Sequence, residues 1–403
     1  MVAAHTNQIT ERPQIAQRPQ IAQRPQIAQR PQIAQRPLIA QRPLIALAAG
    51  GTGGHVFPAL AVAEALQRGG FDTLMLTDRR GARLMPPAGH ITLPAGSPFQ
   101  TGLLRRMRAV GALAAGTFAA LAIMIRRRPR VMIGFGGYPA FAPLLAARLL
   151  GTPSLLHEQN AFLGRANRLL ARWTGNLAIS WDGTINVPPA VTTRTLGMPV
   201  RATFFDSPAL AEKALIDKTD NCLTLTVIGG SLGAGIFADL VPDAISRLDA
   251  PLRRRLTVTQ QCRAEQQTTL LARYAGMDIS ADIRPFFDDM PVILANSHLV
   301  ISRAGASSVA ELAAAGRPAL LVPFAGAMDD HQTKNAKQLE SVGGGQCLAE
   351  AELTAEKLAA HLSAMLQDPA RLAAMGKAAR NLAAASAAAD IADWAIELGG
   401  VGA

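Results

Sequence analysis

The stretch PLIALAAGGTGGHVFPALAVAEALQ, residues 43–67, contains an apolar run, a glycine-rich turn and an alanine- and leucine-rich segment, in that order. This order predicts a buried strand over Leu44–Ala49 and a helix over Ala59–Gln67. Glycines between a strand and a helix let backbone N–H groups approach an anionic ligand closely. The turn is not a P-loop, because no Gly-Lys-Ser/Thr follows. It is also a poor dinucleotide fingerprint, because His55 and Val56 stand where the third glycine should be.

The same alternation of short apolar runs and longer helical segments continues along the chain and starts again at Leu223. It indicates parallel sheets that are covered by helices on both faces. We therefore predict an α/β protein with two doubly wound, Rossmann-like domains, 43–200 and 201–384, and a helix near 385–400 that packs back on the first domain. The predicted strands are Leu44–Ala49, Thr73–Thr77, Val131–Phe135, Ser154–Glu158, Leu177–Trp181, Leu223–Ile228, Leu256–Gln260, Leu299–Ser302 and Ala319–Pro323.

Two more glycine-rich turns follow predicted strands, GFGGYP at Gly134–Pro139 and GGSLGAG at Gly229–Gly235. Ligands of doubly wound folds bind beyond the carboxyl ends of the strands. Three such turns in two domains therefore predict a cleft that handles phosphates. Asp78, at the end of the second predicted strand, could still hold a ribose as in a dehydrogenase, so that alternative stays open.

The composition excludes several classes of protein. Hydrophobic residues make up 49% of the 403 residues and charged residues 17%, which excludes disordered, collagen-like and small disulfide-rich chains. Cys222, Cys262 and Cys347 are too few and too widely spaced for a disulfide framework or a CxxC metal site, so a reducing cytoplasm is the simplest location. The net charge of +11 suits an anionic substrate or membrane surface. No nucleic-acid recognition motif is evident, and we expect no nucleic-acid partner.

Residues 12–41 repeat the hexapeptide RPQIAQ almost perfectly. A proline in every unit excludes a helix, and a period of six is too short for a solenoid. We predict that residues 1–42 form a disordered or polyproline II-like tail. The tail lacks the apolar core of a signal peptide.

Ala109–Ile125 contains no charged residue and is flanked by arginines on both sides. A membrane span needs about 20 apolar residues, and this segment is rich in alanine and only weakly hydrophobic. We predict a buried helix rather than a membrane span. The preceding segment, Pro98–Arg106, combines apolar residues with arginines and suits either a surface that docks on anionic lipid or a solvated helix end.

Long motifs along the chain resemble one bacterial enzyme family, the UDP-N-acetylglucosamine–N-acetylmuramyl-(pentapeptide) pyrophosphoryl-undecaprenol N-acetylglucosamine transferases of glycosyltransferase family 28. These motifs are GGTGGHVFPALAVAEAL, GFGGYPAFAPL, HEQNAFLGRANR, GGSLGAG, SRAGASSVAELAAAGRPALLVPF and DDHQTKNA, and the resemblance runs from about Pro43 to the C-terminus. It implies a GT-B fold and inverting transfer of GlcNAc from UDP-GlcNAc to lipid I (undecaprenyl-diphospho-MurNAc-pentapeptide), with no metal or cofactor. It also implies a peripheral enzyme on the cytoplasmic face of the inner membrane, with cell-wall synthesis and division proteins among its partners.

The resemblance implies roles for the residues that match these motifs. His55 would take the proton from the C4 hydroxyl of the acceptor sugar, although a histidine that only fixes the loop or caps the helix is the alternative. The loops for the acceptor diphosphate would include Gly51, Gly136, Gly137 and Tyr138. The contacts to UDP-GlcNAc would come from Thr52, Gly53, Gly54, Asn160, Arg201, Ser231, Phe287, Ala306, Ser307, Ser308, Glu311 and Gln332.

Glu311 has two competing interpretations. The family role is a hydrogen bond to the ribose hydroxyls, whereas its spacing from Ser308 is that of a capping box. The chain also departs from the family, since Leu232 stands where glutamine is frequent and Met198 replaces the usual asparagine. Alternatives to this function are a related transferase with another acceptor, a UDP-GlcNAc 2-epimerase, and a sugar-nucleotide-binding subunit without activity of its own.

Overall fold

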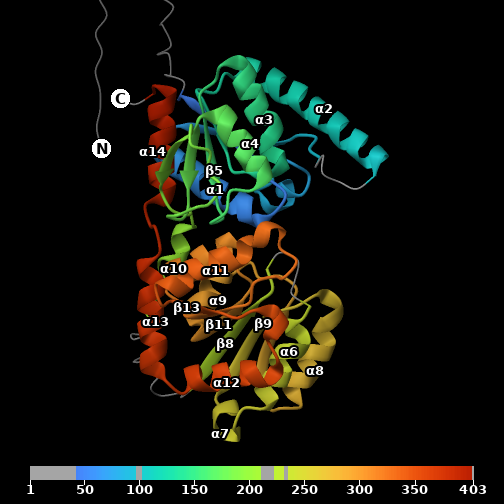
Figure 1. Ribbon diagram of the computed structural model, residues 1–403, viewed down its shortest axis with the longest axis vertical. Helices are drawn as coiled ribbons and strands as arrows, with labels where there is room; N and C mark the ends of the chain where they lie inside the picture. The colour runs from blue at the N-terminus through green and yellow to red at the C-terminus, as the bar shows by residue number, and fades with distance from the viewer. Residues whose placement is uncertain (1–41, 97–101, 210–221, 231–234, 402–403) are drawn as a thin grey trace, which may run out of the picture. The chain divides into compact units, whose positions relative to one another are not determined.

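The structure is a computed structural model that describes residues 42–96, 102–209, 222–230 and 235–401. The predicted repeat tail, apart from Arg42, lies outside these residues. Arg42–Ala403 forms one compact unit. It contains two parallel sheets, and we call the parts built around them the first and second lobes (Figure 1).

The sheet of the first lobe has seven parallel strands within the described residues. Their order in space is β3 (His90–Thr92), β2 (Asp72–Thr77), β1 (Leu44–Ala48), β4 (Val131–Gly134), β5 (Ser154–Glu158), β6 (Asn176–Ile179) and β7 (Thr192–Thr195). The helices around it are α1 (Gly53–Arg68), η1 (Gly81–Leu84), α2 (Leu103–Arg127), α3 (Gly137–Leu150), α4 (Arg165–Thr174) and α14 (Ala387–Gly399).

Alternate residues of β1 point to two separate cores, as the pleat of a strand requires. Ile45 and Leu47 pack with residues of α1 and α14. Ala46 and Ala48 pack with residues of α2, α3 and α4. Helices therefore cover both faces, and all strand ends that precede helices meet at one edge of the sheet.

The sheet of the second lobe has six parallel strands within the described residues. Their order is β10 (Ser280–Arg284), β9 (Leu256–Gln261), β8 (Leu223–Ile228), β11 (Leu299–Ser302), β12 (Ala319–Leu321) and β13 (Gly345–Cys347). The helices are η2 (Ala202–Phe204), α6 (Phe237–Ser246), α7 (Ala250–Arg253), η4 (Ala264–Gln266), α8 (Gln267–Ala275), α9 (Met290–Asn296), α10 (Ala306–Ala315), η5 (Met328–Asp330), α11 (His331–Ser341), η6 (Glu350–Glu352), α12 (Ala355–Leu366) and α13 (Pro369–Asn381).

The prediction of two parallel α/β sheets is confirmed, and each predicted strand is present with similar bounds. Four strands were not predicted from the sequence, and they are the edge strands of the two sheets: β3, β7, β10 and β13. All four residues of β7 are exposed, and two of the three in β3 are exposed. An edge strand covered on fewer sides has no continuous apolar run by which it could be recognised.

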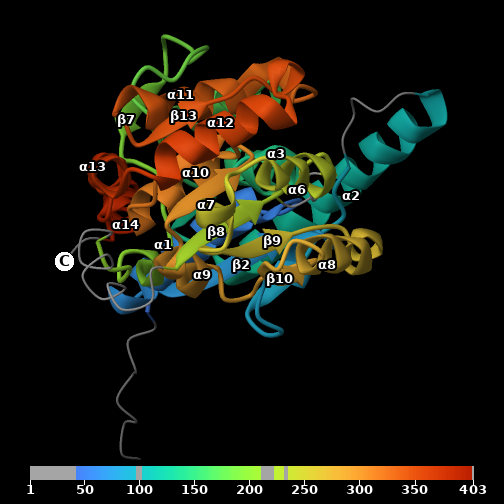
Figure 2. The ribbon, with the colours of Figure 1, turned by 90° about the horizontal axis from the view of Figure 1, so that it is seen from below.

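α2 differs from the buried helix that the sequence predicted. Between Arg106 and Arg127 it is long and apolar enough to cross a membrane by length and composition, but only 28% of its apolar window is buried. Ala120 and Met124 pack into the core, whereas Phe118 is 73% exposed. The prediction is therefore wrong for one face of the helix, since an uncharged surface is not necessarily a covered one. The N-terminal half of α2 projects from its lobe (Figures 1 and 2).

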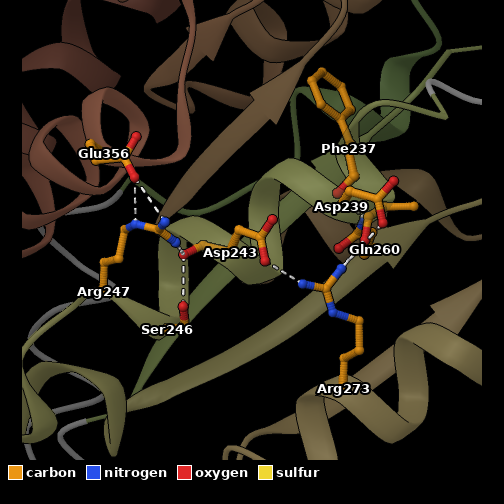
Figure 3. Close-up of polar contacts among 9 residues, drawn as sticks. Phe237, Asp239, Asp243, Ser246, Arg247, Gln260, Arg273 and Glu356 are labelled. Carbon is orange, nitrogen blue, oxygen red and sulfur yellow. Dashed lines mark hydrogen bonds and ion pairs between the residues drawn. The ribbon is translucent and has the colours of Figure 1, made fainter.

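Ion pairs join helices on the surface of the second lobe (Figure 3). Arg273 of α8 reaches Asp239 and Asp243 of α6, and Arg247 pairs with Glu356 of α12. Exposed pairs of this kind contribute about 0–1 kcal/mol each. The stability of the lobe therefore rests mainly on its apolar core.

α14 packs on the first lobe although it follows the second lobe in the chain (Figure 1). Its Trp394 is 2% exposed and joins the core beneath β1 and α1. The guanidinium of Arg194 in β7 lies 4.5 Å from the Trp394 ring centroid. The C-terminal helix thus closes one face of the sheet that holds the first glycine turn.

Truncating Trp394 should therefore destabilise the protein strongly. We expect Trp394→Ala to lower the free energy of unfolding by about 3–5 kcal/mol, measured by urea denaturation, because it removes a large buried ring. Asp393→Ala, an exposed change in the same helix, should change it by less than about 0.5 kcal/mol. Equal effects of the two variants would contradict this account of α14.

Candidate functional site

The first glycine turn joins β1 to α1, which begins at Gly53. Thr52 is the N-cap residue, and its side chain makes no capping hydrogen bond. Its hydroxyl lies 3.3 Å from Nδ1 of His55 instead. Gly51 has φ +81°, a conformation that favours glycine. His55 stands in the first turn of the helix, with its ring beside the side chain of the N-cap residue.

Asp78 organises this turn. Its Oδ1 accepts hydrogen bonds from the N–H groups of Gly51 and Gly81, both at 2.8 Å. A Cβ atom on Gly50 would lie only 2.6 Å from the same oxygen, so glycine is required there. The Asp78 carboxylate is committed to the protein backbone, which argues against the ribose-binding role that a dehydrogenase would give it.

The second glycine turn lies beside the first, because β1 and β4 are neighbours in the sheet. A Cβ atom on Gly137 would lie 3.5 Å from Cε1 of His55. A Cβ on Gly136 would lie 2.6 Å from Nδ2 of Asn167. Both glycines have positive φ, and Tyr138 follows them in the first turn of α3. The ring of His55, in the first loop, thus lies against the second predicted acceptor loop.

His55 has a lowered pKa of about 4, chiefly because burial disfavours the charged ring. A hydrogen bond to the backbone of Gly50 and the charge of Asp78 oppose this effect. The ring is therefore neutral near pH 7. A neutral imidazole is the form that can accept a proton.

The motif HEQN ends β5 with a buried carboxylate, Glu158. Its Oε1 accepts from the backbone and side-chain nitrogens of Asn160, at 2.9 and 3.0 Å, and its Oε2 accepts from Asn167 at 2.7 Å. Burial raises the pKa of Glu158, and these hydrogen bonds oppose the rise. Glu158 therefore fixes Asn160, a predicted sugar contact, and Asn167, which packs against the second glycine turn.

Asn335 of α11 connects this motif to the second lobe. Its Oδ1 accepts from Ala161 N at 2.9 Å, and its Nδ2 donates to Asn160 Oδ1 at 3.1 Å and to Ala304 O at 3.2 Å. The side chain is fully buried. A chain of polar contacts thus runs from Asn167, which packs against Gly136, through Glu158, Asn160 and Asn335 to the turn before α10.

The N-terminus of α10 supplies the predicted contacts Ala306, Ser307 and Ser308. Gly305 is the N-cap residue, with no side-chain capping bond, so the first N–H groups of the helix are open to an anion. A Cβ on Gly54 would lie 3.2 Å from Ser307 Oγ. Predicted UDP-GlcNAc contacts from the two lobes, Gly54 and Ser307, therefore lie close together at this point.

Glu311 lies one turn further along α10. The capping box that could have explained it is not formed, because the helix begins at Ala306 and Ser308 makes no capping bond. Burial raises the pKa of Glu311 to about 7, and the charge of Arg201 opposes the rise. The carboxylate is thus left available for a ligand with hydroxyl groups.

Arg201 lies between aromatic rings of the two lobes. Its guanidinium carbon is 5.4 Å from the Phe57 ring centroid and 5.1 Å from that of Phe204. Its Nε is buried without a hydrogen-bond partner. A buried donor of this kind costs free energy unless it is paired, so it is available to a bound anion.

The remaining predicted contacts are placed differently. Gln332 uses its Oε1 to accept from Phe324 N at 2.9 Å, which leaves its amide nitrogen for a ligand. The side chain of Phe287 is 4% exposed and lies in the protein interior. Ser231 and Leu232 lie outside the described residues. Met198 is buried, and its sulfur lies 3.5 Å from Ser180 Oγ.

Several residues of the quoted motifs make structural contacts for which the sequence predicted no role. Asn167 and Asn335 lie within the quoted motifs, and that position was the available signal. His157 of HEQN contacts Gly197 O and Ser180 Oγ, both at 3.2 Å, and ties β5 to the segment between the lobes. Arg303 pairs with Glu350, which also accepts from Ala325 N in the loop that Gln332 binds. No sequence spacing indicates these long-range partners.

Among the described residues, no group of three or more His, Cys, Asp or Glu side chains could hold a metal ion. The cations and helix N-termini named above are the features that could balance the charge of a diphosphate.

Two family models match most of the chain. The glycosyltransferase family 28 N-terminal domain matches residues 45–179, and the C-terminal domain of the same family matches residues 224–393. The UDP-N-acetylglucosamine–N-acetylmuramyl-(pentapeptide) pyrophosphoryl-undecaprenol N-acetylglucosamine transferase of Bradyrhizobium sp. (strain BTAi1) is 42% identical over 363 residues, 88% of this chain and 98% of that protein. The chain belongs to this transferase family.

Other comparisons agree with membership of the transferase family. The enzyme of the same name from Granulibacter bethesdensis is 44% identical over 86% of this chain and 91% of its own length. A crystal structure of Acinetobacter baumannii MurG is similar with a TM-score of 0.71 and 32% identity, and covers 88% of this chain and 99% of that chain. A UDP-N-acetylglucosamine 2-epimerase from Listeria monocytogenes, at 13% identity and a TM-score of 0.61, covers 87% of this chain and 95% of that chain, and shares the fold alone.

Removing the side chain of Asn335 should loosen the connection between the lobes. We expect Asn335→Ala to lower the free energy of unfolding by about 1–3 kcal/mol in urea denaturation, since it leaves buried partners unpaired. Lys337→Ala on the exposed face of α11 serves as the control and should change it by less than about 0.5 kcal/mol. A native-like stability of Asn335→Ala would contradict the connecting role.

Proposed function

We propose that this protein transfers GlcNAc from UDP-GlcNAc to the C4 hydroxyl of MurNAc in lipid I, with inversion at C1 of the transferred sugar. The main structural support for this proposal is the close approach between the first glycine turn, which holds His55, and the N-terminus of α10. This contact brings the turn that holds the neutral imidazole of His55 close to a helix end that suits a diphosphate, which supports the proposal. The membership of the chain in the transferase family supports the same reaction.

The proposed reaction is a direct displacement. The C4 oxygen of the acceptor forms a bond to C1 of GlcNAc while the bond from C1 to the UDP oxygen breaks. The hydroxyl proton passes to the neutral ring of His55, and UDP leaves with the electron pair of the broken bond. Attack opposite to the leaving group accounts for inversion.

The leaving diphosphate gains charge as the bond to C1 breaks. The open N–H groups at the start of α10, the guanidinium of Arg201 and the predicted contact Ser231 would stabilise this charge. Glu311 would accept hydrogen bonds from the ribose. We propose that these groups suffice without a metal ion.

We also propose a division of labour between the domains. Residues 43–200 would bind the lipid-linked acceptor, and residues 201–384 would bind most of the donor. Asn160 would cross this division, because Asn335 of the second lobe holds it in place.

A location at the cytoplasmic face of the inner membrane completes the proposal. The exposed apolar face of α2 includes Met107, Val110 and Phe118, and arginines flank it at both ends. Apolar side chains flanked by basic residues bind anionic lipid surfaces. The same resemblance implies cell-wall synthesis and division proteins as partners there.

The decisive experiment follows labelled GlcNAc from UDP-GlcNAc into lipid I in the presence and absence of EDTA. We expect transfer to the lipid that survives EDTA. Formation of UDP-ManNAc without transfer would instead indicate an epimerase. Binding of UDP-GlcNAc with no transfer would indicate another acceptor or a subunit that needs a partner.

Replacing His55 should abolish most of the activity without loss of donor binding. We expect His55→Ala to reduce turnover by about 100-fold or more, while UDP-GlcNAc affinity stays unchanged. His90→Ala in the same lobe is the matched control. Near-normal turnover of His55→Ala would exclude His55 as the base.

The pH profile should report the lowered pKa of His55. A base with a pKa of about 4 stays neutral until the solution is far more acidic than for an ordinary histidine at 6.5. We therefore expect kcat/KM for the acceptor, measured with saturating UDP-GlcNAc so that the titration of free Glu311 does not contribute, to fall only as pH approaches 4. A half-loss near pH 6.5 under these conditions would contradict the lowered pKa of His55.

The membrane proposal predicts that a change in α2 weakens binding of the protein to lipid vesicles. Phe118→Asp places a charge on its exposed apolar face and should weaken sedimentation with anionic phospholipid vesicles by about tenfold. Leu271→Asp, on the exposed surface of α8, is the matched control and should bind vesicles like the unaltered protein. Equal binding of both variants would contradict docking through α2.

A further inference from the structure

Neither predicted acceptor loop contains a lysine or an arginine. The first reads AGGTGGH over residues 49–55, and the second reads GFGGYP over residues 134–139. His55 is neutral near pH 7 because of its lowered pKa. The Gly51 N–H group already donates to Asp78. A bound diphosphate would therefore meet glycine amides but no formal positive charge from these loops.

Arg80 supplies a positive charge next to the first loop. It lies between the end of β2 and η1, and β2 is the neighbour of β1 on the side away from β4. A Cβ atom on Gly51 would lie 3.7 Å from Arg80 Nη2. The guanidinium of Arg80 thus lies beside Gly51 in the first glycine turn.

Close backbone packing sets this placement. A Cβ on Gly81 would lie 2.8 Å from Gly50 Cα, so glycine at position 81 lets the segment after β2 rest directly on the first turn. The Gly81 N–H group is held by Asp78 Oδ1. Arg80, the preceding residue, is therefore brought to the turn by the backbone itself.

Asp78 also orients the Arg80 side chain. Its Oδ1 holds the two backbone amides, while its Oδ2 lies 3.6 Å from Arg80 Nε. An ion pair at Nε leaves the donors of both Nη atoms for another partner. The Arg80 side chain is 73% exposed, so an anion can reach it.

Other arginines of the chain show the contrast. Arg317 is fully buried and donates to the carbonyls of Pro208, Leu294 and Ala295. Arg303 donates hydrogen bonds to the carboxylate of Glu350 and to backbone carbonyls. These two guanidinium groups stabilise the fold, whereas that of Arg80 faces solvent beside a loop that suits an anion.

We propose that Arg80, oriented by Asp78, is a further binding residue for the diphosphate of the lipid-linked acceptor. This inference rests on the proposed function, which supplies an acceptor with a diphosphate. Arg80 would donate charge-assisted hydrogen bonds to the phosphate oxygens beside the first glycine turn. Asp78 is a positioning residue that acts through Arg80 and the turn.

The test compares Arg80→Gln with Arg83→Gln, an exposed arginine of the adjacent η1. Both full-length variants are assayed with lipid I and with a matched acceptor in which an uncharged linker replaces the diphosphate. For Arg80→Gln we expect the KM of lipid I to rise about 10- to 100-fold, as for loss of a hydrogen bond to a charged group. The KM of UDP-GlcNAc and kcat should stay unchanged. On the uncharged acceptor the two variants should be equal.

The same variants separate the possible roles of Arg80. An equal loss on both acceptors would show a structural role and overturn the proposal, as would a lipid I KM equal to that of Arg83→Gln. Asp78→Asn keeps an oxygen for the two amides and loses the ion pair. We expect its effect on lipid I KM to be non-additive with Arg80→Gln, and full additivity would overturn the positioning role of Asp78.

Two binding measurements separate the sources of phosphate and the two proposals. Calorimetric titration with a soluble short-chain prenyl-diphospho-MurNAc-pentapeptide, without UDP-GlcNAc, should show weaker binding by Arg80→Gln. Binding to anionic phospholipid vesicles should be unchanged, and loss of vesicle binding alone would assign Arg80 to lipid headgroups and overturn the proposal. If the unaltered protein binds the acceptor through Arg80 but transfers no sugar, the proposed function fails and the Arg80 site stands.

Discussion

A carboxylate buried without a cation would be costly, and Glu158 is tolerated because amide groups surround it. The backbone and side chain of Asn160 satisfy one oxygen, and Asn167 satisfies the other. The orientation of both asparagines is therefore set by a single carboxyl group. Asn167 fits against Gly136, and Asn160 is held on its other side by Asn335. The predicted acceptor and donor sites share this polar chain.

Burial shifts the pKa values of two ionisable groups of the predicted site. Burial keeps His55 neutral, with a pKa of about 4, so it can accept a proton. Burial also raises the pKa of Glu311 to about 7, so the group gains from hydrogen-bond donors such as sugar hydroxyls. The unpaired Nε of Arg201 gains in the same way from an anion. Each of these groups is better satisfied with a ligand present than without one.

The sequence was least informative where burial is partial. The continuous apolar runs of central strands were recognisable, whereas the edge strands β3 and β7 consist mainly of exposed residues. For α2, absence of charge was taken as evidence of burial, but Phe118 and Met107 are exposed. Hydrophobicity along a chain reports what can be covered and does not report whether another element covers it.

The sequence by itself determined the fold class, the central strands, the three glycine turns and the family, because these depend on local patterns and on motifs contiguous in the chain. It also supplied the candidate residues around His55 and Glu311. Only the tertiary structure decided which partners these residues have. Asp78 could have held a ribose, but its carboxylate binds Gly51 and Gly81. Asn335 meets Asn160 from 175 positions away. Such contacts form where strand ends converge at one edge of a sheet, and no spacing along the chain encodes that convergence.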